Sequence, residues 1–174
     1  MFYRIQDTHV SLICVDRIQQ RQISKLIDEI HETSSDIFIQ VVDPSLIYGI
    51  DHILGALKIS IESKNRRIMA AKRLEIDLLL RLFCTDQISS ALKLAAPKKN
   101  CHGCLIIFSR NKKQMTVVKG YVERLFVCID QSILLPTKTK RKMICSNLHL
   151  ASGDFLEDRE FTMYLLERAA LIIG

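Results

Sequence analysis

The chain has 174 residues, of which 48% are hydrophobic and 25% charged, and its formal net charge is +6. This composition excludes a disordered or fibrous chain, and no uncharged apolar run approaches the roughly 20 residues that cross a bilayer. We therefore expect one globular domain spanning residues 1–174, with no membrane partner.

Charge and cysteine content bear on the partner and the compartment. A positive net charge favours an anionic partner. The six cysteines are spread through apolar segments, which is typical of buried thiols in a reducing compartment rather than of a disulfide framework. The N-terminal sequence contains Arg4 and Asp7 and lacks the apolar core of a signal peptide. We expect a cytoplasmic protein, which would also be nuclear if the source is eukaryotic.

The first third of the sequence predicts alternating strands and helices. Apolar runs at residues 10–15 and 36–42 have strand length, and the spacing of apolar residues between them fits a helix. Asp43 followed by Pro44 predicts a helical turn. Asp51 is placed to cap a longer helix that ends near Ser63.

The central stretch, residues 68–94, is the most apolar part of the chain and predicts a buried helical hairpin. Its first helix carries an apolar stripe interrupted by Arg81, and Asp77 is spaced to pair with that arginine one turn later. Thr85 or Asp86 is placed to cap the second helix. The apolar residues of the second helix are Ile88, Ala91, Leu92 and Ala95.

The remaining sequence predicts one clear strand, at residues 104–108, and further helices. Residues 112–126 fit a helix, while their LFVCI end fits a strand equally well, and residues 132–135 predict a short strand. Helices are expected from Thr137 to Leu148 and from about Glu157 onward. The fold class is therefore α/β, with a small mixed sheet of about four strands packed against several helices.

Catalytic motifs are missing from the sequence. There is neither a glycine-rich phosphate loop nor a G-x-S-x-G nucleophile motif, so we expect no enzyme activity, no catalytic residues, no metal and no cofactor. His52 has no acidic or cysteine partner one turn away, which favours a packed histidine over a ligand contact.

Cys101 and Cys104 form a C-x-x-C motif, the spacing of a zinc half-site or a redox pair. No second close pair of ligands accompanies it, and it precedes a predicted strand instead of opening a helix. We interpret it as a loop with unrelated thiols; a small redox or zinc protein is the alternative.

Basic residues gather between the helix that ends near Ser63 and the central helix. If the two helices are antiparallel, these cations form a patch that can neutralise consecutive phosphates. A solvated face without a ligand is the alternative. Lys138 to Lys142 form a weaker second candidate, and aromatic residues are too scarce for a base-stacking platform. The residues of the first patch are Lys64, Arg66, Arg67, Lys72 and Arg73.

The sequence ends in an apolar segment that contains Leu171, Ile172 and Ile173. A core helix would explain this segment. Because apolar residues at a chain end are prone to exposure, a docking surface for a protein partner is also plausible.

Four segments carry a resemblance to a known family. They are the DP-x-x-I-x-G-x-x-H-x-x-x-A block at residues 43–56, the Q-I-x-x-A block at 87–91, the strand at 104–108 and LLERAALI at 165–172. In this order and spacing they resemble the PRPK-binding (CGI-121-type) proteins, the non-catalytic subunit family of the KEOPS complex.

The resemblance implies a subunit that binds and regulates the kinase-like ATPase of KEOPS and, through it, contacts the threonylcarbamoyltransferase. This complex makes threonylcarbamoyladenosine (t6A) in tRNA, and the family member helps hold the tRNA at its 3′ CCA end. On this interpretation the basic patch binds tRNA, and Leu171, Ile172 and Ile173 bind the protein partner. A stand-alone RNA-binding module is the main alternative, because it explains the charge without the apolar end.

Overall fold

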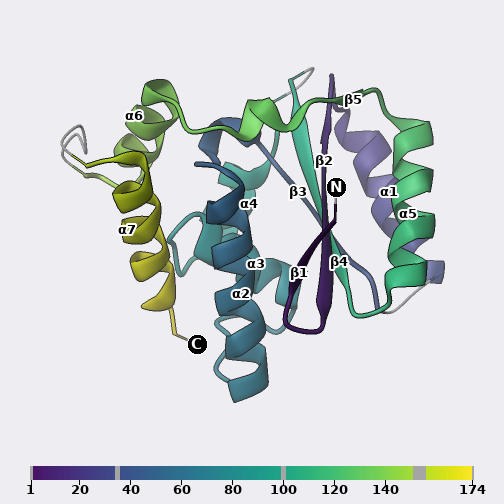
Figure 1. Ribbon diagram of the computed structural model, residues 1–174, viewed down its shortest axis with the longest axis horizontal. Helices are drawn as coiled ribbons and strands as arrows, with labels where there is room; N and C mark the ends of the chain where they lie inside the picture. The colour runs from purple at the N-terminus through teal and green to yellow at the C-terminus, as the bar shows by residue number, and fades with distance from the viewer. Residues whose placement is uncertain (1, 34–35, 99–100, 151–155, 174) are drawn as a thin grey trace. The chain divides into compact units, whose positions relative to one another are not determined.

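The computed structural model describes residues 2–33, 36–98, 101–150 and 156–173, and its helices and strands confirm the α/β class (Figure 1). The strands are β1 (Phe2–Ile5), β2 (Thr8–Val15), β3 (Phe38–Val42), β4 (Gly103–Ser109) and β5 (Cys128–Ile129). The α-helices are α1 (Gln20–Thr33), α2 (Ile50–Arg66), α3 (Leu74–Leu82), α4 (Ile88–Ala95), α5 (Lys112–Leu125), α6 (Lys138–Asn147) and α7 (Asp158–Ala170). Two 3₁₀ turns are η1 (Pro44–Leu46) and η2 (Gln131–Leu134).

Residue contacts divide the chain into two compact units. The sheet unit comprises Met1–Pro44 and Ala96–Ile133, and the helical unit comprises Ser45–Ala95 and Leu134–Gly174. The expectation of one domain over residues 1–174 stays a prediction.

The sheet of the sheet unit has the strand order β1-β2-β4-β3, and β5 pairs with the end of β2. Every pairing is antiparallel, so the predicted mixed sheet is wrong in this detail. The direction of β4 depends on the long excursion of the chain between β3 and β4, which apolar patterning does not encode. The short strand β1 was not predicted, and β5 falls within the LFVCI segment, for which a strand was the stated alternative.

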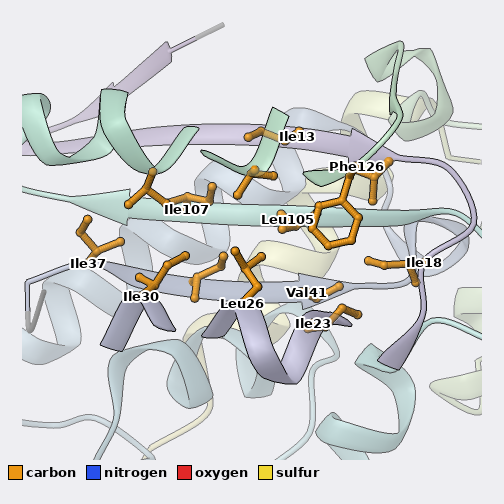
Figure 2. Packing of buried hydrophobic residues seen from close by; sticks show 14 of the residues in the cluster. Ile13, Ile18, Ile23, Leu26, Ile30, Ile37, Val41, Leu105, Ile107 and Phe126 are labelled. Atoms are coloured by element: carbon orange, nitrogen blue, oxygen red, sulfur yellow. The ribbon is translucent and has the colours of Figure 1, made fainter. Parts of the chain in front are cut away.

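Helices α1 and α5 cover the same face of this sheet. Figure 2 shows Ile23, Leu26 and Ile30 of α1 beside Leu105 and Ile107 of β4, within one buried apolar cluster. Met115, Val118 and Val122 bring α5 into the same cluster. The helical periodicity of residues 112–126 therefore predicted this element correctly, while β5 takes up part of the LFVCI segment.

Helix α2 is the longest element of the helical unit, and its two ends differ from the prediction. Gly49 (φ 93°) is its N-cap, and Asp51 lies within the first turn, where its charge favours the helix dipole, instead of capping. At the other end Arg67 adopts the left-handed conformation (φ 60°), and the Ile68 N–H donates to the Ser63 carbonyl at 2.9 Å. This arrangement ends the helix as a Schellman motif does.

The central hairpin is confirmed as two helices, but it is shorter and less buried than predicted. Because the chain leaves α2 through the left-handed Arg67, residues 68–73 are not helical and α3 begins at Leu74. Helix α3 is buried along most of its length, whereas Ile88 and Leu92 of α4 are each 45% exposed.

The helix starts of the C-terminal half follow their capping residues. The Asn111 side chain caps α5, the Thr137 hydroxyl accepts from the Lys140 N–H before α6, and Glu157 and Glu160 form a capping box at α7. The strand predicted at residues 132–135 is wrong, since η2 occupies this segment. Among the helices described, none is long and apolar enough to cross a membrane.

Candidate functional site

The predicted tRNA-binding residues all lie on one connection of the helical unit. We call residues 64–73, from the last turn of α2 to the start of α3, the basic turn. All five of its cationic side chains are exposed. The Arg73 Nε donates to the Glu75 carboxylate at 2.6 Å, so part of the positive charge of the turn is neutralised at this end. The five residues are Lys64, Arg66, Arg67, Lys72 and Arg73.

A buried ion pair lies beneath the basic turn. The Arg81 Nε and the Asp77 Oδ2 are 2.7 Å apart on α3, and their side chains are 1% and 0% exposed. Two buried charges are stable only when their remaining hydrogen-bonding atoms find partners, because leaving water is costly for each of them. The other partners of this pair therefore define what it holds in place.

On one side the ion pair holds the basic turn. The Ala70 N–H donates to the Asp77 Oδ1 at 2.8 Å, and the Arg81 Nη2 donates to the Ser63 Oγ at 2.9 Å. Ser63 lies in the last turn of α2 and Ala70 in the middle of the basic turn. The side chains of α3 thus hold the last turn of α2 and the middle of the basic turn.

On the other side the same arginine holds the C-terminal segment. The Arg81 Nη1 donates to the carbonyls of Ala169, at 2.8 Å, and Ile172, at 3.2 Å. The Ala169 carbonyl lies in the last turn of α7, where helix carbonyls lack helical partners and the dipole favours a cation, and Ile172 lies just beyond the helix.

The predicted partner-binding residues come directly after α7 in the sequence. We call Leu171, Ile172 and Ile173 the apolar tail. Leu171 and Ile173 are 78% and 73% exposed, and Ile172 is half-buried. The tail therefore presents two apolar side chains to solvent while its backbone is held by Arg81. The basic turn and the apolar tail share one anchor.

The second basic candidate is divided between the surface and the interior, since Lys138 and Lys142 are exposed and its other two cations are buried. Lys140 and Arg141 are only 8% and 7% exposed. The Arg141 guanidinium donates to the Tyr48 hydroxyl at 2.8 Å and 3.0 Å and to the Asp158 Oδ1 at 2.7 Å, which connects the segment before α2 with α6 and α7. We call Tyr48, Arg141 and Asp158 the clamp, and its role is structural.

His52 and the C-x-x-C motif show no arrangement for catalysis. His52 is buried, its Nδ1 accepts from the Tyr48 N–H at 3.3 Å, and burial lowers its pKa to about 4, so the imidazole is neutral at pH 7. Cys101 is exposed while Cys104 is buried in β4. No group of three or more metal-ligating side chains occurs within the part of the chain that the structure describes.

The sequence predicts the cations and the apolar tail but not the buried pair that holds their backbone. Arg81 interrupts an apolar stripe in the sequence, and its i,i+4 spacing from Asp77 is the one sign of the pair. A lone arginine inside an apolar helix face, with an acidic residue one turn away, is the signal of a buried ion pair. Its contacts with Ser63 and Ile172 depend on tertiary packing and have no sequence signal.

Comparison with known protein families identifies the family of the chain. The family described as kinase binding protein CGI-121 matches residues 16–144, which include the basic turn and the Asp77–Arg81 pair and end before α7. A search of curated proteins found no match to the chain. The matched segment covers most of the sequence and confirms the family predicted from the order of its motifs: the chain belongs to the CGI-121 family of kinase binding proteins.

Proposed function

We propose that this chain is a non-catalytic subunit of the KEOPS complex in t6A modification of tRNA. It binds and regulates the kinase-like ATPase subunit, reaches the threonylcarbamoyltransferase complex through that subunit, and helps bind tRNA at its 3′ CCA end. The observation that carries the proposal is the presence, on one anchor, of an exposed cationic turn and an exposed apolar tail in a member of a kinase-binding family. The work of the subunit takes place in the cytoplasm, and also in the nucleus if the source is eukaryotic.

The apolar tail supports the protein-partner half of the proposal. Exposed apolar side chains gain roughly 25 cal/mol for each Å² that a partner covers. Because Arg81 already fixes the backbone at Ile172, docking of Leu171 and Ile173 costs less conformational entropy than docking of a free chain end.

The basic turn supports the tRNA half. Exposed lysines and arginines on one short segment match a phosphate backbone, whose counterions are released on binding. A stand-alone RNA-binding module remains the second candidate, since the basic turn alone would suffice for it. The two functions differ in whether the apolar tail is needed for a protein complex.

Co-elution with the kinase-like subunit tests the partner half. Ile173→Arg places a charge on the apolar tail and is expected to abolish co-elution in gel filtration. Val117→Arg is the matched control, because Val117 on α5 is also a strongly exposed apolar residue, at 69% against 73%. Co-elution of Ile173→Arg at the wild-type level would remove the tail from the proposal, whereas a wild-type chain that does not co-elute would favour the stand-alone module.

A further inference from the structure

We propose that the Asp77–Arg81 ion pair is a positioning device that couples the basic turn to the apolar tail. Occupation of either surface then stabilises the other. The identity of the two ligands, a polyanion and an apolar protein surface, rests on the proposed function. The coupling itself is a property of the isolated chain.

The hydrogen bonds of the pair divide between the two surfaces. Asp77 holds the basic turn through the Ala70 N–H but makes no direct hydrogen bond to the tail among the described residues. Arg81 holds the tail through the carbonyls of Ala169 and Ile172. A disturbance of the tail can therefore reach Ala70 through the 2.7 Å contact between Arg81 and Asp77.

The burial of the pair makes this connection stiff. Neither charge can leave its partner for water without local opening of the helical unit, since both side chains are at most 1% exposed. A guanidinium is a planar fork, so its orientation toward Asp77 also fixes the direction of the nitrogen that binds the tail. Loosening the tail lets the guanidinium move and weakens its hold on Asp77.

The same contacts imply reciprocity. Suppose that the tail is held more tightly when the basic turn is ordered. A polyanion bound to the turn then raises the affinity of the tail for its protein partner. By linkage, the partner raises the affinity of the turn for the polyanion by the same factor. Asp77 and Arg81 would thus regulate binding without touching either ligand.

Amide hydrogen exchange on the isolated chain tests the coupling from the tail. The double substitution Leu171→Gly with Ile172→Gly loosens the backbone that supplies the carbonyl of residue 172, and it leaves the buried pair intact. We expect the Ala70 amide to exchange at least about fivefold faster, because its hydrogen bond to Asp77 weakens. Ile173→Gly is the matched control: it loosens an exposed residue that supplies no carbonyl to Arg81, and the Ala70 rate should stay unchanged.

The coupling in the opposite direction, from the ion pair to the tail, is tested with Asp77→Asn. This substitution weakens the ion pair at the residue that does not contact the tail. We expect faster exchange of the Leu171 and Ile172 amides, with unchanged rates in the strands β2 and β4. Faster exchange confined to Ala70 would overturn the coupling. If this variant fails to fold, the tail variant decides alone: a loosened tail with an unchanged Ala70 rate would overturn the proposal. Neither result depends on tRNA or the kinase-like subunit, so the proposed function can fail separately.

Discussion

His52 is a fully buried titratable residue, 1% exposed, at the start of α2. Its burial in the helical unit lowers its pKa from 6.5 to about 4, because the apolar surroundings disfavour the imidazolium. An unfolded chain takes up a proton at this residue near pH 6.5, whereas the folded chain does so only near pH 4. His52 therefore contributes stability that is complete above pH 6.5 and is lost as the pH falls toward 4.

We predict that the wild-type chain loses up to about 3 kcal/mol of unfolding free energy from this residue between pH 6.5 and pH 4. His52→Asn retains an oxygen that can accept from the Tyr48 N–H but cannot titrate. Urea denaturation at several pH values should give a shallower pH dependence for this variant. Equal pH dependence in the two proteins would mean that the pKa of His52 is not lowered in the folded state.

Arg67 is a second residue whose conformation has a measurable cost. It is held at φ 60° and ψ 36°, a left-handed conformation that suits glycine. We predict that Arg67→Gly raises the unfolding free energy by about 1 kcal/mol. Arg66→Gly, one position earlier and inside α2, removes the same charge but should lower stability by about 1 kcal/mol. Thermal denaturation shows whether each variant is more or less stable than the wild type. A loss of stability in both variants would contradict the assigned helix end.

Some features of individual residues could be predicted from the sequence, and others could not. The basic turn and the apolar tail were predicted because charge and apolarity at consecutive positions are visible in the sequence. The left-handed Arg67 was not, since the usual glycine signal of a helix end is missing there. The contacts of Arg81 with Ser63 and Ile172 join residues far apart in the chain, which no local pattern reports.

At the scale of elements, the clamp connects the segment before α2 with α6 and α7. Arg141 lies at 4.9 Å from the Phe161 ring centroid and donates to both the Tyr48 hydroxyl and Asp158. A buried arginine that loses one of its acceptors keeps the cost of leaving water without full compensation. Removal of the Tyr48 hydroxyl should therefore lower the free energy of unfolding by more than the loss of one oxygen atom suggests.

We predict that Tyr48→Phe lowers the unfolding free energy by about 1 to 3 kcal/mol. Tyr164→Phe is the matched control, since the Tyr164 hydroxyl accepts from Arg168 at 3.1 Å in a partly exposed position, and its loss should cost less than about 1 kcal/mol. Urea midpoints of the two variants decide between these values. Equal, small losses would show that Asp158 and the Leu156 carbonyl satisfy Arg141 without the Tyr48 hydroxyl.

Most elements followed from apolar periodicity and capping residues. The helices α1, α2, α5, α6 and α7 and the strands β2, β3 and β4 were predicted, because each has enough residues for a pattern. Short elements were harder to predict: β1, with four residues, was not predicted, β5, with two, was only an alternative to a helix, and η2 lies where a strand was predicted. The all-antiparallel sheet depends on the path of the whole chain and was out of reach of local rules.

At the scale of the whole molecule, the net charge of +6 is consistent with an anionic partner, and the basic turn supplies five of the cations. The logarithm of an RNA affinity should fall with the logarithm of salt concentration, in proportion to the phosphates neutralised. We predict that replacing Arg66 and Lys72 by Gln reduces the magnitude of this slope by about 2. Arg17→Gln with Arg21→Gln, two exposed arginines of the sheet unit, is the charge-matched control and should leave the slope nearly unchanged.

In the proposed function, the chain binds tRNA at its 3′ CCA end as part of the KEOPS complex. The most direct measurement compares the binding of intact tRNA with that of the same tRNA lacking its last three nucleotides, across a salt series. The proposed function predicts a marked loss of affinity on trimming at every salt concentration, in addition to the common salt dependence. Equal affinity for the two tRNAs would contradict recognition of the CCA end and reduce the basic turn to a non-specific phosphate contact.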